Sequence, residues 1–176
     1  MSPVVLERTL PSCTVATLRD MARAGADCLA LHGVDYRGSL LGDGGRRVIC
    51  FYMAPDAEAV RIVNRQGGAA FDRVWTAEIP GGHGDDLLPR DAAAPWVAVE
   101  RGFPAPVAFT ELQAREAGHG WCLEAHGVRA LRSYVSTDGR RMLCLYAAPD
   151  AEAVRQVQVT AGMPFDRAWQ AELYRP

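Results

Sequence analysis

The octapeptide Ala-Pro-Asp-Ala-Glu-Ala-Val-Arg occurs twice in this chain, at Ala54–Arg61 and at Ala148–Arg155. The copies lie 94 residues apart (148 − 54), and Trp75 recurs at the same offset as Trp169. Near the start of each copy the offset is one residue shorter, because Glu7-Arg8 corresponds to Glu100-Arg101. Two long copies indicate a duplicated domain, since a solenoid needs at least three stacked units.

The composition excludes several classes of protein. A net charge of −2 over 176 residues gives no electrostatic footprint for nucleic acid. No apolar run reaches the roughly 18 residues of a membrane span, and the first residues lack the pattern of a secretion signal. The 5 cysteines do not suggest a disulfide framework, so we expect a cytoplasmic protein. The chain contains no lysine, which excludes Schiff-base chemistry.

The two copies predict the same order of elements. Short β-rich segments are followed by helical periodicity, two further strands, a second helix and a last strand. Pro55 and Pro149 suit the first position of the second helices. The expected elements are strands at 4–8, 34–41, 47–53 and 72–79 with helices at 14–31 and 55–66, and strands at 96–101, 128–136, 141–147 and 166–174 with helices at 107–125 and 149–161.

The order β-α-β-β-α-β, present twice, predicts an α+β protein of two tandem ferredoxin-like units. We expect the first unit at 1–79, a linker rich in Gly, Asp, Ala and Pro at 80–95, and the second unit at 96–176. The two antiparallel sheets are expected to pack face to face as a pseudo-dimer, and the protein is a candidate for self-association.

In this plan both helices cover one face of the sheet, and strand residues alternate between the faces. We expect Leu6 to face the helices and Glu7 to face away. The apolar series Ile49, Phe51 and Met53 predicts that the alternate residues of that strand lie on the helix-free face. The helix-free faces are therefore predicted to carry Glu7, Cys50, Tyr52 and Glu78 in the first unit, and Glu100, Arg132, Tyr134, Cys144, Tyr146 and Glu172 in the second.

These side chains suggest two kinds of chemistry. Carboxylate and thiolate groups are both metal ligands, so the cluster predicts binding of a metal ion or a small molecule. Alternatively, Glu100 and Glu172 supply an acid and a base, with Tyr134 and Tyr146 as polar contacts. Because Gly38 and Leu40 stand where the second unit has Arg132 and Tyr134, the second unit is the one expected to keep a site.

A second group of candidate metal ligands lies at the ends of the first helices. Cys28 and His32 are four residues apart on one helix face, and Cys122 and His126 repeat this spacing. A histidine at a helix C-terminus also interacts favourably with the helix dipole, so a purely structural role is the alternative.

The tract Cys144-x-Tyr146-x-Ala148-Pro149-Asp150, with Ser133-Tyr134-Val135, resembles a family of small bacterial ferredoxin-like proteins named after a nickel-responsive, nickel-binding member. The resemblance covers nearly all of both units and implies the ferredoxin-like fold and a nickel cofactor. It also implies a histidine before Ser-Tyr-Val and another in the second helix. Here Arg132 and Gly38 occupy the first of these positions, and neither second helix contains a histidine.

The sequence therefore predicts a small soluble protein that binds a metal ion or small molecule on a sheet face or in a cavity between the repeats. The alternative is a tailoring enzyme of isomerase, cyclase or lyase type that uses carboxylates in that cavity. Neither nucleic acid nor a membrane is an expected partner.

Overall fold

The structure is a computed structural model that describes residues 1–84, 86–90 and 95–176. It divides into two compact units. Unit 1 comprises Met1–Ala77, Gly82–Leu88 and Glu172–Pro176, and unit 2 comprises Glu78–Gly81 and Pro89–Ala171. The boundaries 1–79, 80–95 and 96–176 and the face-to-face packing of the sheets remain predictions. No helix among the described residues has the length and apolarity needed to cross a membrane.

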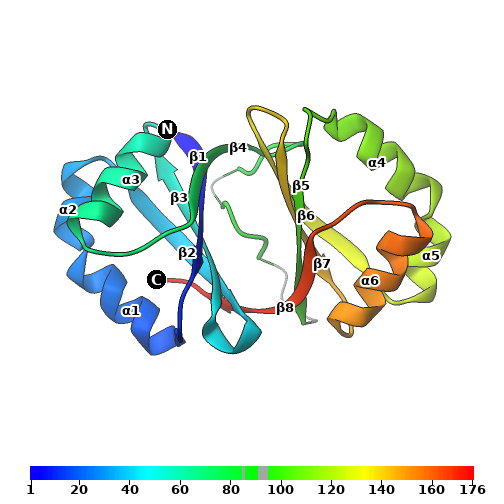
Figure 1. Cartoon of the computed structure of the whole chain (residues 1–176), viewed down its shortest axis with the longest axis horizontal. Helices are drawn as coiled ribbons and strands as arrows, with labels where there is room; N and C mark the ends of the chain where they lie inside the picture. The colour runs from blue at the N-terminus through cyan, green and yellow to red at the C-terminus, as the bar shows by residue number, and fades with distance from the viewer. Residues whose placement is uncertain (85, 91–94) are drawn as a thin grey trace. The chain divides into compact units, whose positions relative to one another are not determined.

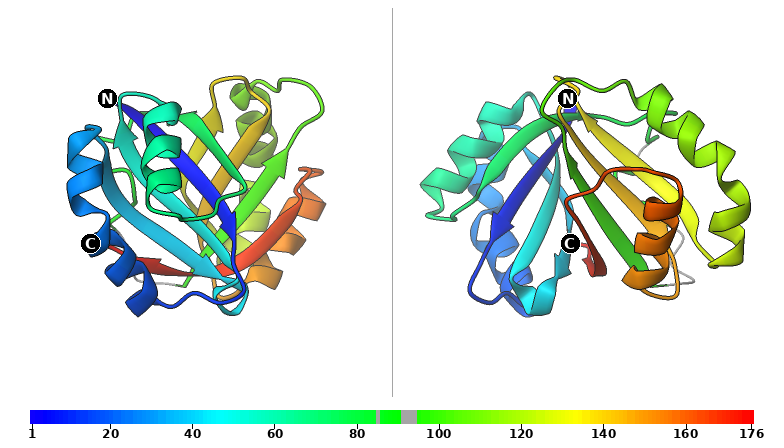
Figure 2. Two further views of the ribbon diagram at one scale, coloured as in Figure 1. Left: turned by 60° about the vertical axis from the view of Figure 1, so that its left-hand side comes forward. Right: turned by 45° about the vertical axis from the view of Figure 1, so that its right-hand side comes forward.

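In unit 1 three helices cover one face of an antiparallel sheet (Figures 1 and 2). The strands lie in the order β4-β1-β3-β2, and the last residues of β8 pair with β2. The elements are β1 (Ser2–Thr9), α1 (Val15–Ala24), α2 (Ala26–Leu31), β2 (Asp35–Gly42), the short 3-10 helix η1 (Asp43–Gly45), β3 (Arg47–Ala54), α3 (Ala57–Gln66) and β4 (Arg73–Glu78).

Unit 2 repeats this arrangement, with strands in the order β8-β5-β7-β6 (Figures 1 and 2). Its elements are β5 (Trp96–Gly102), α4 (Phe109–Gly118), α5 (Gly120–Ala125), β6 (Arg129–Ser136), β7 (Arg141–Ala147), α6 (Ala151–Thr160) and β8 (Arg167–Tyr174). The predicted β-α-β-β-α-β order is thus confirmed in both copies, and the chain has a mixed α/β fold with two repeats.

The first helix of each unit differs from the prediction, because it is divided into two. In unit 1 α1 ends at Gly25, whose N–H bonds to the carbonyl of Met21 at 3.0 Å, and α2 begins at the next residue. Glycine is a poor helix former because it loses the most backbone freedom. In unit 2 the division falls at His119, between Gly118 and Gly120.

The repeated octapeptide forms the start of α3 and of α6. Asp56 is the N-cap of α3, where its Oδ1 accepts the N–H of Ala59 at 2.8 Å, and Asp150 caps α6 through Ala153 in the same way. Pro55 and Pro149 therefore precede the cap, so their predicted place at the first helical position is wrong. The octapeptide is a helix start that both units use.

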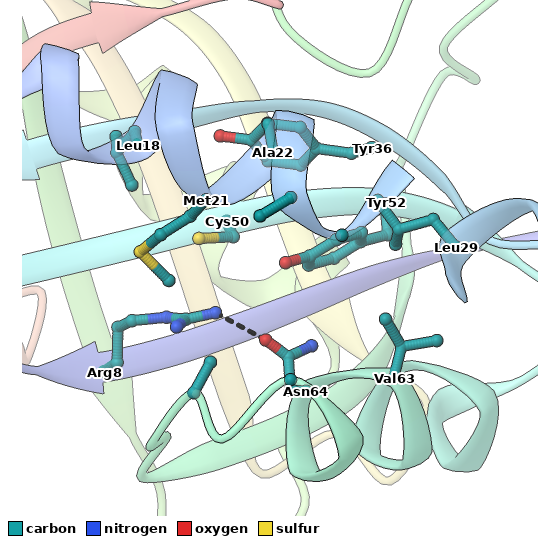
Figure 3. Close-up of a pocket in the computed structure, with 14 residues that line it drawn as sticks. Arg8, Leu18, Met21, Ala22, Leu29, Tyr36, Cys50, Tyr52, Val63 and Asn64 are labelled. Atoms are coloured by element: carbon teal, nitrogen blue, oxygen red, sulfur yellow. Dashed lines mark hydrogen bonds between the residues drawn. The ribbon is translucent and has the colours of Figure 1, made fainter. Parts of the chain in front are cut away.

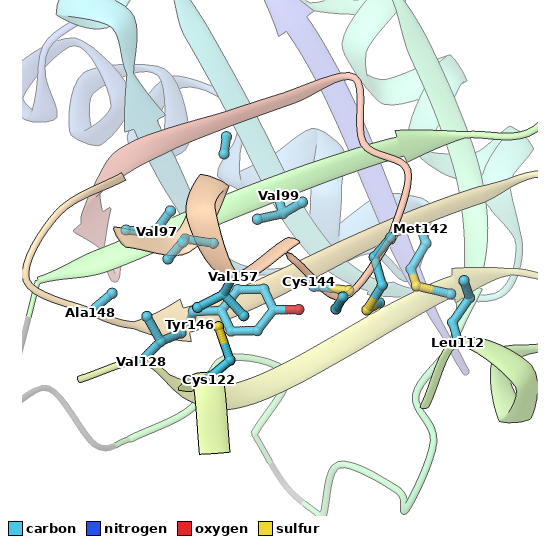
Figure 4. Close-up of a cluster of buried hydrophobic side chains, with 14 of the residues drawn as sticks. Val97, Val99, Leu112, Cys122, Val128, Met142, Cys144, Tyr146, Ala148 and Val157 are labelled. Atoms are coloured by element: carbon cyan, nitrogen blue, oxygen red, sulfur yellow. The ribbon is translucent and has the colours of Figure 1, made fainter. Parts of the chain in front are cut away.

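Each unit has its own apolar core between the sheet and its helices. In unit 1 this core includes Leu6, Val48, Cys50, Tyr52 and Val60. In unit 2 it includes Val99, Met142, Cys144, Tyr146 and Val154 (Figure 4). The alternate residues of β3 are buried too, because Ile49 is 1% exposed and Phe51 is fully buried. Both faces of this strand are therefore inaccessible to water.

The C-terminal residues complete unit 1 beside β2. Tyr174 stacks near Tyr36 with ring centroids 6.3 Å apart, and Arg175 donates to the carbonyl of Leu88 at 3.4 Å. Gly38 has a φ of 138°, and a Cβ built on it would lie 2.5 Å from the carbonyl oxygen of Tyr174. Glycine is required at this position by close packing, which explains why no larger residue stands there in this copy.

Stability should be sensitive to Gly45 and much less to Gly44. Both have positive φ, but a Cβ on Gly45 would lie 2.0 Å from the carbonyl oxygen of Cys13, whereas one on Gly44 meets nothing within 4 Å. We expect Gly44→Ala to cost about 1–2 kcal/mol of unfolding free energy from backbone strain alone. Gly45→Ala should cost about 1–3 kcal/mol more from the clash. Urea denaturation measures both, and equal losses would contradict the account.

Candidate functional site

The strand register determines which side chains face the helices. Leu6 lies opposite Cys50, and Val4 lies opposite Tyr52, so all of these point toward the helices with the rest of the core. The prediction for Leu6 is confirmed, but the predicted orientation of β3 is wrong. Alternation could not decide it, because both sets of β3 side chains are apolar and buried.

The predicted first-unit cluster is consequently divided between faces. Glu7 lies opposite Ile49 on the helix-free face, whereas Cys50 and Tyr52 face the helices. Glu7 accepts hydrogen bonds from Arg47 Nη2 and from Trp75 Nε1, both at 2.8 Å, in a buried ion pair. Glu78 is exposed at the end of β4. The Glu7 carboxylate therefore makes structural contacts on the helix-free face, away from Cys50 and Tyr52.

The predicted second-unit residues are only partly brought together. Leu143 of β7 lies opposite both Glu100 and Tyr134, so these two side chains share the helix-free face. Arg132 lies opposite Leu145 on the same face. Cys144 and Tyr146 lie on the other face, within the helix-covered core, and Glu172 is exposed in β8. The four groups proposed for acid–base catalysis therefore do not converge, and Glu100 accepts the Trp169 Nε1–H at 2.7 Å.

A cavity of about 280 Å³ lies on the helix-covered face of unit 1, a position that the sequence did not predict. It opens between the sheet, α1, α2 and α3, and apolar side chains form most of its lining (Figure 3). The lining includes Arg8, Leu18, Met21, Ala22, Leu29, Tyr36, Cys50, Tyr52, Val63 and Asn64. This volume is close to the lower end of the range of about 300–1,000 Å³ for ligand pockets.

Arg8 supplies a positive charge at this cavity. It follows Leu6 by two residues on β1, so it faces the helices, and its side chain is 2% exposed. Its Nη2 donates to Asn64 Oδ1 at 2.7 Å, and Figure 3 shows the guanidinium directed toward that amide. Within the described part of the chain its Nε and Nη1 have no hydrogen-bond partner. Unpaired buried donors are costly, so this arrangement needs a reason.

The Arg8 guanidinium has no acidic partner among the described residues, yet it remains charged. Burial alone would lower its pKa, but the neighbouring Cys50 and Tyr52 outweigh that effect and raise it. Asn64 is held in place by its own Nδ2, which donates to the carbonyl of Val60 at 2.8 Å. The cavity therefore presents a fixed cation in an apolar setting, which favours an anion.

Two tyrosines add hydroxyl groups to the same cavity. A bulge in β2 between Tyr36 and Gly38 puts Tyr36 and Ser39 on one face, and their hydroxyls lie 2.6 Å apart. The ring centroids of Tyr36 and Tyr52 are 5.4 Å apart. Burial, reinforced by Cys50, raises the pKa of both phenols. Both hydroxyls therefore stay protonated at neutral pH and can donate hydrogen bonds.

At most of the equivalent positions unit 2 carries larger side chains, and Ala130 in place of Tyr36 is the exception. Met142, Ala161 and Met163 are all buried in the unit 2 core. Arg101, the counterpart of Arg8, donates to Gln158 Oε1 at 2.6 Å and to the carbonyl of Pro164. The replacements from unit 1 to unit 2 are Ala22 by Glu116, Tyr36 by Ala130, Val48 by Met142, Asn64 by Gln158, Gly67 by Ala161 and Ala69 by Met163.

The metal candidates do not form a nickel site. Cys28 Sγ and His32 Nε2 lie 3.1 and 3.2 Å from the same atom, Gln66 Oε1. No group of three or more His, Cys, Asp or Glu side chains gathers among the residues that the structure describes. The pair at Cys122 and His126 lacks the glutamine, because Thr160 replaces it. Nickel prefers several nitrogen or oxygen ligands in defined geometry, and two donors with an amide do not fit it.

Arg8 is the functional candidate that sequence reasoning missed, although a signal was present. Leu6 is expected to face the helices, so the next residue of that parity must face them too. An arginine on the helix-covered side of a strand is unusual, because charged residues are almost never fully buried unless they are paired. The repetition of Glu-Arg in both copies marks the same position.

The chain belongs to the family described as nickel responsive protein SCO4226-like, whose model matches residues 5–76 and again residues 98–170. No curated protein is significantly similar to it in sequence.

Similar solved structures share the fold. A protein described as a putative chlorite dismutase is 14% identical, with 98% of this chain and 94% of that chain covered and a TM-score of 0.51. A mutant chlorite dismutase from Candidatus Nitrospira defluvii, in complex with cyanide, is 9% identical, with 97% and 90% covered and a TM-score of 0.52. At these identities the likeness concerns the fold alone.

Glu7 should be needed for stability. Its carboxylate, 6% exposed, neutralises Arg47, which is equally buried. Glu7→Gln keeps the shape but removes the charge of the partner that lies 2.8 Å from the buried Arg47 guanidinium, and Asp72 is farther away at 3.4 Å. We expect a loss of about 3 kcal/mol in unfolding free energy, because removing one partner of a buried pair leaves the other uncompensated. The exposed Glu78→Gln should change stability by less than about 0.5 kcal/mol. Comparable losses in the two variants would contradict the ion-pair role.

Replacing the two buried arginines should have unequal effects on folding. Arg101→Met removes hydrogen bonds to Gln158 and Pro164, whereas Arg8→Met removes the one to Asn64. Since a hydrogen bond to a charged group contributes about 1.5–3 kcal/mol, Arg101→Met should lower the unfolding free energy by about 2 kcal/mol more. Chemical denaturation of both variants tests this. Equal or greater damage from Arg8→Met would mean that Arg8 is mainly structural.

Proposed function

We propose that this protein binds a small, largely apolar molecule in the cavity of unit 1. The observation that carries the proposal is Arg8, whose charge is buried against apolar side chains with two donor nitrogens unpaired in the described structure. A group that costs stability and is not compensated within the fold is typical of a site that awaits a partner. The apolar lining supplies contact area, and the hydroxyls and amide supply orientation.

The supporting evidence favours binding in one repeat rather than in both. Unit 1 has small residues, Ala22, Gly67 and Ala69, where it lines the cavity. Unit 2 has larger side chains at the equivalent positions, Glu116, Ala161 and Met163, and the last two are buried in its core. This reverses the expectation that the second unit keeps the site while the first is a wall.

The proposal differs from the two functions that the sequence suggested. Nickel binding follows from the family, but the described residues do not gather the ligands that nickel needs. Of the groups predicted for acid–base catalysis, Tyr134 shares the helix-free face with Glu100, but Tyr146 lies on the opposite face and Glu172 is exposed in β8. Binding in the unit 1 cavity requires neither a metal nor a convergence of carboxylates.

Binding can be tested with two probes that differ in one group, 4-phenylbutyrate and 4-phenylbutan-1-ol. We expect at least one to bind the wild-type protein with a dissociation constant below about 1 mM, as expected for a good ligand of this size. Ala69→Met should abolish binding, because a methionine at the equivalent position fills the unit 2 core. Isothermal titration calorimetry measures this directly.

The matched control is Ala70→Met, one residue further on, which is exposed and does not line the cavity. It should leave the affinity unchanged. Failure of both probes to bind the wild-type protein, or equal loss of binding in the two methionine variants, would overturn the proposal.

A further inference from the structure

The two repeats differ most informatively at one position of the first helix. Ala22 of α1 lines the cavity of unit 1, and the residue at the same place in unit 2 is Glu116 of α4 (22 + 94 = 116). The Glu116 carboxylate reaches inward, because its Oε1 is buried and has no hydrogen-bond partner among the described residues. Unit 2 thus carries a carboxylate of its own where unit 1 has open space.

A tyrosine and an arginine near that carboxylate are common to both units. In unit 2 burial and the neighbouring Cys144 and Glu116 together raise the pKa of the Tyr146 phenol. Arg101 Nη2 lies 3.5 Å from the same hydroxyl. In unit 1 the counterparts Tyr52 and Arg8 are both present and both line the cavity. Figure 3 shows the Tyr52 hydroxyl directed to the side of the cavity where Arg8 and Asn64 lie.

Unit 1 has no acid of its own to complete this arrangement. Ala22 cannot supply one, and no ion pair of Arg8 exists within the described residues. Arg8 lines the cavity and has no anionic partner among the described residues, and a guanidinium group is well matched by a carboxylate. In the largely apolar surroundings of this cavity such a pair is stronger than in bulk water.

We propose that the ligand of unit 1 carries a carboxylate, which takes the place beside Tyr52 and Arg8 that Glu116 fills in unit 2. The carboxylate accepts hydrogen bonds from the Arg8 guanidinium and from the Tyr52 hydroxyl. The apolar body of the ligand lies along Leu18, Met21 and Leu29. The ligand class is therefore a small apolar carboxylic acid. This inference rests on the function proposed above and narrows it.

The two probes test separately whether the cavity binds a ligand and whether a carboxylate on that ligand matters. With wild-type protein, 4-phenylbutyrate should bind at least tenfold more tightly than 4-phenylbutan-1-ol, a difference of about 1.4 kcal/mol. In Arg8→Met the preference for 4-phenylbutyrate should disappear. Equal wild-type affinities, or a preference that survives Arg8→Met, would overturn the carboxylate inference and leave binding itself intact. Absence of binding by both probes would overturn binding and the inference together.

A second measurement needs no ligand and guards against a misfolded Arg8→Met variant. Ala22→Glu should install the carboxylate of unit 2 in unit 1, with Ala22→Gln as the neutral control of equal size. We expect Ala22→Glu to melt at a higher temperature than Ala22→Gln at pH 7. The two variants should melt alike at a pH where the carboxylate is protonated. Ala22→Glu should also abolish binding of 4-phenylbutyrate. A glutamate variant no more stable than the glutamine variant at pH 7 would contradict the inference.

Discussion

An arginine on the helix-covered face of the first strand constrains each unit of this protein. Arg8 and Arg101 are both 2% exposed, and neither has an acidic partner among the described residues. A buried charge of this kind is costly unless hydrogen bonds surround it. Unit 2 meets more of the requirement internally, with Gln158, the carbonyl of Pro164 and Tyr146 around the guanidinium, and only Nε of Arg101 lacks a partner among the described residues. In unit 1 both Nε and Nη1 of Arg8 lack one, and Arg8 lines a cavity.

The two units share one fold but surround the buried arginine with different side chains. The helix starts, the strand order and the bulge in the second strand are common to both units. The differences concentrate around the arginine, where unit 2 has a longer amide, larger apolar side chains and a glutamate. Met142, Ala161 and Met163 are buried in the unit 2 core, whereas Ala22, Gly67 and Ala69 line the cavity of unit 1. Natural proteins commonly give up stability where a binding site requires it, and the two units show both states in one chain.

The sequence was sufficient for the fold but not for the site. Each element occurs in two copies whose sequences can be compared, so the order of the elements and most boundaries were predictable. The faces of β3 were not, because Val48, Cys50 and Tyr52 are as apolar as Ile49 and Phe51, and alternation is silent when both faces are buried. That error moved Cys50 and Tyr52 to the wrong side and paired them with Glu7. The break of the first helix at Gly25 and the bulge beside Gly38 depend on backbone packing that periodicity does not reveal.

The central claim is that Arg8, and not Arg101, receives the anionic group of a ligand. Nuclear magnetic resonance of the arginine Nε–H groups during titration with 4-phenylbutyrate tests it most directly, with the two signals assigned from Arg8→Met and Arg101→Met. We predict that the Arg8 signal shifts and saturates with the ligand, while the Arg101 signal stays in place. A titration in which Arg101 or exposed arginines shift and Arg8 does not would contradict the account.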